Sequence, residues 1–150
     1  MPRFARLFEA AADTLNAYYQ TVAENDIDGL MALWIDEDFA SFIDASGSHW
    51  HGIDSIRAGL AQLAAGQALP AAVEPLDVRV YDSLGTVVYA VAEAHRLRDP
   101  LAPPRMVYTT YVMVHERGEW RIAHVHASTM PNETANEFVA KMRQGQGALH

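Results

Sequence analysis

The chain contains no cysteine, no long apolar run and few positive charges. The lack of cysteine excludes a disulfide framework, a thiolate zinc site and a cysteine nucleophile. The 11 lysines and arginines against 19 acidic residues give a net charge of −8, which argues against a broad nucleic-acid surface and against docking on anionic membranes. No apolar stretch is long enough to span a bilayer, and the N-terminal residues lack the hydrophobic block of a signal peptide. We therefore expect a cytoplasmic protein that binds neither nucleic acid nor membranes.

Half of the 150 residues are apolar, which is enough for one domain with a proper core. The first half of the chain has apolar residues at spacings of three and four, which predicts helices, and from residue 76 the period changes to two, which predicts strands. The helices are expected over residues 4–22, 27–34, 53–63 and 132–142, and the strands over 39–44, 49–51, 76–81, 86–97, 105–115 and 120–127. Asn25 and Asp26 are expected to end the first helix and to cap the second. The tail over residues 145–150 is expected to fray.

Helices that precede an antiparallel run of strands form the α+β pattern. We expect a single domain over residues 1–150, in which one strongly curved antiparallel sheet wraps around the long N-terminal helix. Three helices lie before the main strands and a short helix follows them. Such a sheet makes a cone, and its open mouth suits a small-molecule pocket.

The last two predicted strands allow a register count. If Arg117–Gly118 forms a two-residue turn, counting outward puts Tyr111 opposite His124 and Thr109 opposite His126. Directly opposed residues share a face, so this count places both histidines with Tyr111. A β-bulge would shift the register.

His124 and His126 are separated by one residue, so their imidazoles project from one strand face. They could bind a ligand or metal, or do acid–base work, because imidazole titrates near neutral pH. The alternative is a packed, hydrogen-bonded pair within the sheet or at a subunit contact. We expect both to contact a ligand, and we expect no metal and no cofactor.

Asp44 ends the first short strand, just before a turn, among apolar neighbours that include Phe42 and Trp50. A carboxylate near apolar groups can have a raised pKa and act as a general base. The alternative is a turn aspartate that accepts hydrogen bonds from the backbone of Ser46 or Gly47. Phe42, Trp50 and Trp34 are candidates for the pocket wall, or else for plain core packing.

Glu93 is the sole acid in the apolar stretch over residues 87–94. An acid there must be paired, protonated or facing a wet cavity. Tyr89, Val91 and His95 share its strand face. Tyr111 could donate a hydrogen bond to a substrate carbonyl or a developing oxyanion, or simply be a buried tyrosine with some other partner.

Four stretches that together cover most of the chain carry a family resemblance: residues 25–34, 39–47, 51–56 and 118–128. The last is the most specific, with Trp120, His124 and His126 in a strand that ends at Ser128. The chain resembles the nuclear-transport-factor-2-like superfamily, in particular the SnoaL-like domains. Its ending is similar to that of the calcium/calmodulin-dependent kinase II association domain.

The resemblance implies a fold, whereas function within the superfamily varies. It includes steroid isomerases, scytalone dehydratase, polyketide cyclases, epoxide hydrolases and non-catalytic assembly modules. Asp44 falls where the steroid isomerases carry their catalytic base. Tyr18 or Tyr19 would supply the oxyanion-hole tyrosine, but no aspartate stands at the matching late-strand position.

The kinase association domain lines its pocket with arginines, and the corresponding positions here are Glu93, Tyr111 and Ala127. An arginine pocket of that kind is therefore not expected. The resemblance also implies that Ala127 faces the pocket, against the hairpin count. One bulge near the strand end would reconcile the two.

Two functions follow as hypotheses. The first is cofactor-free isomerase, dehydratase or cyclase chemistry on a small apolar or carbonyl-bearing molecule, with Asp44 as general base, Tyr111 as hydrogen-bond donor and Glu93 as a second acid. Tyr18 and the two histidines of the last strand would contact the ligand. The second is a non-catalytic assembly module that forms a homodimer through the sheet. A metalloprotein built on the histidine pair is a third, minor alternative.

Overall fold

The computed structural model describes the backbone of residues 2–148 and the side chains of residues 11–144. Within them the elements follow the order α1 (Pro2–Ala23), α2 (Ile27–Met31), β1 (Ser41–Ile43), β2 (His49–His51), α3 (Ile53–Ala65), β3 (Ala72–Ser83), β4 (Thr86–Arg96), β5 (Arg105–Glu116), β6 (Glu119–Thr129) and α4 (Asn132–Ala148). The α+β prediction is confirmed, element by element. Of the tail expected to fray, residues 145–148 belong to α4 and residues 149–150 lie outside the described part. No helix in the described residues is long and apolar enough to cross a membrane.

The break between α1 and α2 follows from local chemistry. Asn25 has a φ of 58°, a left-handed conformation that asparagine tolerates better than most residues. Asp26 then caps α2, because its Oδ1 accepts the backbone N–H of Gly29 at 3.0 Å. This turn leads the chain from the long helix into the short one, as the sequence predicts.

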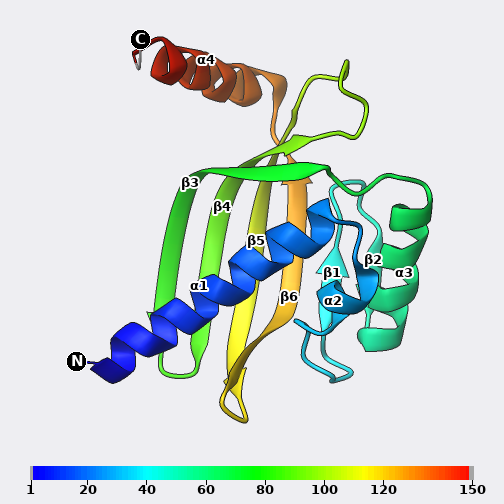
Figure 1. Cartoon of the computed structure of the whole chain (residues 1–150), viewed down its shortest axis with the longest axis vertical. Helices are drawn as coiled ribbons and strands as arrows, with labels where there is room; N and C mark the ends of the chain where they lie inside the picture. The colour runs from blue at the N-terminus through cyan, green and yellow to red at the C-terminus, as the bar shows by residue number, and fades with distance from the viewer. Residues whose placement is uncertain (1, 149–150) are drawn as a thin grey trace.

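The six strands form one sheet in the order β2-β1-β6-β5-β4-β3. Every pairing between these strands is antiparallel except that of β1 with β6, which is parallel. The sheet is therefore mixed, which corrects the prediction of an antiparallel sheet. The β1–β6 pair joins distant parts of the chain, so no tight turn forces its strands to run in opposite directions. Figure 1 shows the sheet curving behind α1, with α2 and α3 beside β1 and β2.

A bulge at Ala123 sets the faces of β6. The Arg117–Gly118 turn is present, and His115 pairs with Trp120 as predicted. Beyond it Met113 pairs with Ile122, but Val112 pairs with His124, so Ala123 is an extra residue on β6.

Past the bulge the predicted register is wrong by one residue. Tyr111 lies opposite Val125 instead of His124, and Thr109 lies opposite Ala127. The side chains of His124 and His126 therefore project from the face away from Tyr111. The placement of Ala127 on the pocket face, which the resemblance implies, agrees with this register.

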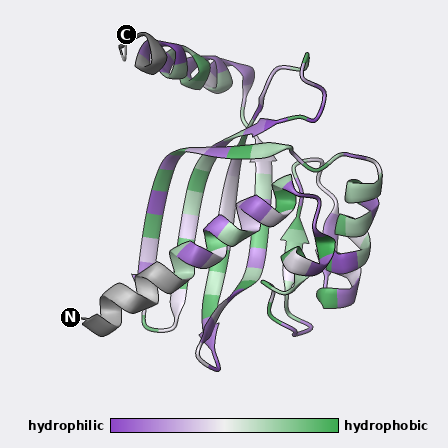
Figure 2. Ribbon diagram, in the orientation of Figure 1, coloured by the Kyte–Doolittle hydropathy of each residue, from purple (hydrophilic) through white to green (hydrophobic). Residues whose placement is uncertain are grey.

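The main core lies between α1 and the inner face of the sheet, the face that carries Tyr111, and it extends under α2 and α3. Hydrophobic positions recur along the strands that α1 crosses (Figure 2). The largest fully buried side chains include Trp34, Leu30, Ile56, Leu60, Met113 and Ile122. A smaller cluster around Ala92, Ala94 and Met106 packs against α4 on the other side of the sheet.

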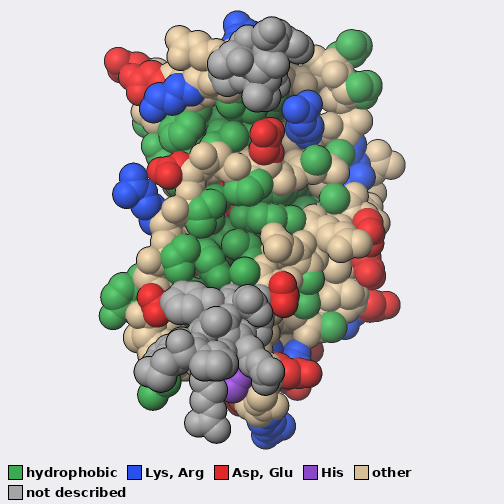
Figure 3. Space-filling model, turned by 60° about the vertical axis from the view of Figure 1, so that its left-hand side comes forward, with side chains coloured by type: hydrophobic (Ala, Val, Ile, Leu, Met, Phe, Trp, Pro, Cys, Tyr) green, Lys and Arg blue, Asp and Glu red, His purple; other side chains and the backbone are tan. Residues whose placement is uncertain are grey.

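Strand β3 is the open edge of the sheet, and it carries exposed apolar side chains. Val78, Val80 and Tyr81 are 45%, 48% and 67% exposed. Figure 3 turns this side of the molecule forward and shows hydrophobic side chains gathered in its centre, with charged side chains around them.

Candidate functional site: a polarised cavity

A cavity of about 720 Å³ opens between the inner face of the sheet, the C-terminal half of α1, and α3. Most of its lining is apolar. The apolar lining residues include Val22, Phe42, Leu60, Leu63, Leu69, Val73, Leu97, Val125 and Ala127. This volume lies within the ordinary range of small-molecule sites.

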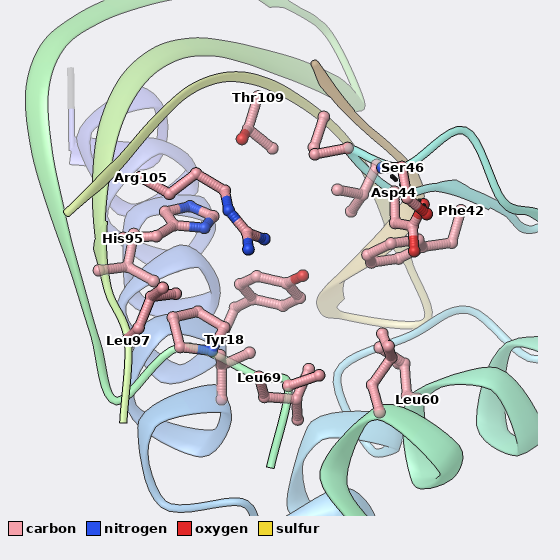
Figure 4. A pocket seen from close by; sticks show the side chains of 18 of the residues that line it. Tyr18, Phe42, Asp44, Ser46, Leu60, Leu69, His95, Leu97, Arg105 and Thr109 are labelled. Atoms are coloured by element: carbon pink, nitrogen blue, oxygen red, sulfur yellow. Dashed lines mark hydrogen bonds between the residues drawn. The ribbon is translucent and has the colours of Figure 1, made fainter. Parts of the chain in front are cut away.

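Polar side chains reach the cavity from two opposite sides. His95 and Arg105 lie together on one side and Asp44 with Ser46 on the other, with Tyr18 between them (Figure 4). His95 and Arg105 are cross-strand neighbours on β4 and β5, so they share the inner face. The cavity is therefore cationic at the β4–β5 side, where Arg105 lies, and carries a carboxylate at the turn after β1.

Behind the cationic side lies a fully buried carboxylate. Glu93 has 0% exposure. Its Oε2 accepts the hydroxyls of Tyr111 at 2.6 Å and Tyr19 at 2.8 Å. Its Oε1 contacts the hydroxyl of Thr109 and Nε2 of His95, each at 2.8 Å. Three hydroxyl donors, two at Oε2 and one at Oε1, suit an ionised carboxylate, which accepts hydrogen bonds and donates none.

The tyrosines around Glu93 are held in their neutral, donating form. Burial, reinforced by the negative charge of Glu93, raises the pKa of Tyr18, Tyr19 and Tyr111 well above the usual value. Their rings meet edge to face, with centroids 5.3 Å apart for Tyr18 and Tyr111. The Tyr18 hydroxyl points into the cavity (Figure 4) and makes no hydrogen bond to any described residue.

His95 is the residue whose role the sequence analysis missed. A carboxylate that only accepts hydrogen bonds makes Nε2 of His95 the donor, so Nδ1 carries the free lone pair. His95 lines the cavity and its side chain is 18% exposed. The sequence feature that could have identified His95 as a site residue is its position two residues after Glu93, on the same strand face.

Asp44 serves the turn and the cavity at once. Its Oδ1 accepts the backbone N–H groups of Ser46 and Ser48 at 3.0 and 2.9 Å, and the Ser46 hydroxyl at 2.6 Å. This is the turn role that the sequence left open as the alternative. Its Oδ2 makes no hydrogen bond to the described residues, and the side chain lines the cavity (Figure 4).

The structure therefore brings four of the predicted residues to one cavity: Tyr18, Phe42, Asp44 and Tyr111. Glu93 lies directly behind it, with both oxygens occupied by donors. The hydroxyl of Tyr111 is directed to Glu93, so it does not reach into the cavity as a free donor.

Four other predicted ligand contacts do not line this cavity. The bulge turns His124 and His126 to the outer face, where His124 pairs with Ser41 of β1. Burial and the neighbouring imidazoles lower the pKa of His124. No group of three or more potential metal ligands occurs among the described residues.

The two tryptophans pack elsewhere. Trp34 is 2% exposed, bridges to Ile122, and borders a separate cavity of about 270 Å³ at the β5–β6 turn. Trp50 lies against Gly59 of α3, whose missing side chain makes room for the indole. Both were predicted as pocket walls. They do not reach the cavity, because the segment after α2 holds Trp34 against Ile122 of β6 and β2 carries Trp50 onto α3.

Comparison with known proteins agrees with this architecture. The SnoaL-like domain family matches residues 11–133. The chain belongs to this family. No curated protein matches its sequence.

Solved structures share the fold of this SnoaL-like domain at low identity. A provisionally named calcium/calmodulin-dependent protein kinase type II association domain from Thiobacillus denitrificans is 22% identical, with a TM-score of 0.71 over 79% of this chain and 93% of that chain. A provisionally named dehydratase of the NTF2-like family from Streptomyces avermitilis is 18% identical, with a TM-score of 0.72 over 82% and 95%. A provisionally named ketosteroid isomerase from Parabacteroides distasonis is 14% identical, with a TM-score of 0.65 over 79% and 86%. Likeness at this level shows the fold alone.

Proposed function

We propose that this SnoaL-like domain binds a small, mainly apolar molecule in the cavity and catalyses cofactor-free proton transfer on it, of the isomerase, dehydratase or cyclase type. The observation that carries the proposal is the Glu93–His95 pair. A buried carboxylate fixes one ring nitrogen of an imidazole that faces an apolar cavity, and leaves the other nitrogen free. This is the arrangement that a general base requires.

In this proposal His95 takes the proton through Nδ1 and returns it to a neighbouring atom of the substrate. Glu93 holds the imidazole in the correct tautomer and stabilises the imidazolium that forms. The Tyr18 hydroxyl donates a hydrogen bond to a substrate oxygen. Asp44, predicted as the general base, instead offers its free Oδ2 as a hydrogen-bond acceptor on the opposite wall.

Glu93 and Tyr111 are positioning residues in this scheme. Both oxygens of Glu93 are occupied, and the Tyr111 hydroxyl is one of the groups that occupies them. They act through His95 and do not touch the substrate. The names of the dehydratase and isomerase among the structural neighbours are consistent with proton-transfer chemistry on this fold.

The test is solvent-deuterium incorporation into a panel of ketones and β,γ-unsaturated ketones, read by mass spectrometry. We expect His95→Gln to lower the rate by about 10²–10⁴-fold. Glu93→Gln should change the pH profile of the rate, because the imidazole loses its carboxylate partner. His115→Gln, on the exposed β5–β6 hairpin, is the matched control and should leave the rate unchanged. Incorporation that survives in His95→Gln but vanishes in Asp44→Asn would assign the base to Asp44.

A second candidate function is assembly of a homodimer through the outer face of the sheet. The outer face carries Tyr108, 41% exposed, with Ala90 and Thr110 paired across β4 and β5. The likeness to a provisionally named kinase association domain favours the same function. Small apolar and aromatic side chains on an uncovered sheet are typical of subunit contacts.

Light scattering on protein eluting from a gel-filtration column tests the assembly function. We expect a dimer that Thr110→Arg converts to a monomer, because the substitution places a charge in the contact. Leu101→Arg, in the exposed loop between β4 and β5, is the control. A wild-type monomer at micromolar concentration contradicts assembly and leaves the cavity proposal unaffected.

A further inference from the structure

We infer that the ligand of the cavity is an apolar molecule that carries a carboxylate, which Arg105 binds with His95 beside it. The inference rests on the proposed function only in requiring that the cavity binds a ligand. It does not depend on the proton-transfer step.

The first observation that supports the inference is that the acidic residues of the cavity wall are not paired with its cationic residues. The acidic lining residues, Asp44 and Asp99, each use one oxygen to cap a turn. Oδ1 of Asp44 accepts hydrogen bonds from residues 46 and 48, and Oδ1 of Asp99 accepts the N–H of Leu101 at 3.0 Å. Neither acid forms an ion pair with a cationic group in the described residues. These two acidic charges are therefore tied to local turns. Glu93, which lies behind the wall, contacts His95, and no acid in the described residues forms an ion pair with Arg105.

Arg105 is the second support. It begins β5 on the inner face, and its guanidinium points into the cavity next to the ring of His95 (Figure 4). It has no ion pair and no hydrogen bond within the described part of the chain. A planar guanidinium with free donors matches a carboxylate in a two-point contact.

Arg98 adds positive charge to the same side. Its Nη2 donates to the carbonyls of Val22 and Ala23 at the end of α1 and to the carbonyl of Pro70. These oxygens carry no net charge, so the guanidinium charge is not neutralised. Its Nε is buried and has no hydrogen-bond partner among the residues that the structure describes. In a chain with a net charge of −8, this cationic side of an apolar cavity selects an anion.

The rest of the cavity wall indicates the chemical nature of the ligand's body. Between the cationic side and Asp44 the surface is mainly apolar, with leucine, valine and alanine side chains from α1, α3, β3 and β6 around the Tyr18 side chain. An apolar body gains free energy by burial there, while a second charged group in the middle would lose its hydration without a partner. The wall therefore fits a monocarboxylic acid with a hydrocarbon body.

Titration calorimetry with decanoate and with decan-1-ol tests the inference, because the probes share the chain and differ in the head group. We expect the wild-type protein to bind decanoate at least about tenfold more tightly than decan-1-ol. Arg105→Gln should weaken decanoate binding by about tenfold and leave decan-1-ol binding unchanged. Arg117→Gln, in the exposed β5–β6 turn, is the matched control and should bind both probes as the wild type does.

The outcomes separate the inference from the proposed function. Equal affinity for the two probes in the wild type, or an Arg105→Gln variant that keeps the preference for decanoate, overturns the carboxylate assignment while the ligand cavity stands. Failure of both probes to bind counts against the cavity as a ligand site and overturns both proposals. Thermal unfolding of Arg105→Gln at the wild-type temperature shows that any loss of affinity is local.

Discussion

Replacing Tyr111 by phenylalanine is the most direct probe of the buried carboxylate. The substitution removes one hydroxyl that donates to Oε2 of Glu93 at 2.6 Å and leaves the ring in place. Tyr111 is 2% exposed and Glu93 is 0% exposed, so water cannot easily replace the lost donor. The edge-to-face contacts of the ring with Tyr18 and Tyr19 remain.

The expected cost follows from the charge and burial of the acceptor. A hydrogen bond to a charged group contributes about 1.5–3 kcal/mol, and a buried acceptor that loses its donor lies in the upper part of that range. We therefore expect Tyr111→Phe to lower the free energy of unfolding by about 2–3 kcal/mol. For a chain of this length that corresponds to a fall in Tm of about 4–12 °C. Tyr19→Phe should cost less, because its bond at 2.8 Å is only partly buried.

Urea unfolding followed by circular dichroism gives the free energies, and Tyr89→Phe is the matched control. Tyr89 lies on the same sheet face, is 5% exposed, and its hydroxyl makes no hydrogen bond to the described residues. We expect this control to stay within about 0.5 kcal/mol of the wild type. A Tyr111→Phe variant as stable as Tyr89→Phe would refute the view that Glu93 depends on its donors.

Two further predictions concern packing and pH. Gly59→Ala should destabilise the fold despite the better helix propensity of alanine, because the new Cβ would lie 2.3 Å from the Trp50 ring. Gly66→Ala should be neutral in the same unfolding assay, because its Cβ would meet only ordinary van der Waals contacts, at 3.6 and 3.8 Å from the carbonyl oxygens of Gln62 and Leu63. Burial lowers the pKa of His124 below its usual 6.5, so the unfolded chain binds the proton more readily. Stability should then fall as the pH drops below about 6.5, and less so in His124→Asn; a pH-independent difference in Tm between the two would contradict this.

The fold could be predicted from the sequence because the sequence signals that specify it are local. The change of period at residue 76, the Arg117–Gly118 turn and the Asp26 cap each act over a few residues. The pairing of Glu93 was also predictable from the sequence, because a buried acid inside an apolar strand requires hydrogen-bond partners. Its buried, hydrogen-bonded state agrees with that argument.

The site was harder to predict because it depends on the register of strand pairing and on contacts between segments that are distant in the sequence. The bulge at Ala123 leaves no recognisable mark in the sequence, and it moves His124 and His126 to the other face. His95 was placed correctly on the face of Glu93, but its hydrogen bond to the carboxylate became visible only in three dimensions. Arg105 lies opposite His95 in the β4–β5 pairing. This register could not be counted from the sequence, because the length of the loop between the two strands was uncertain.

The bulge at Ala123 also separates the length of β6 from the chemistry of the cavity wall. Deleting that one residue would leave a regular strand with the same pairs, Val112 with His124 and Tyr111 with Val125, so Val125 and Ala127 would stay in the cavity. Flattening the bulge without a deletion would instead restore the simple count, in which Tyr111 faces His124, and the two imidazoles would enter the cavity in their place. A slip of one residue would thus convert an aliphatic wall into a basic one without any substitution, so relatives of this domain that keep the same number of residues in this strand but lack the bulge can have quite different ligands.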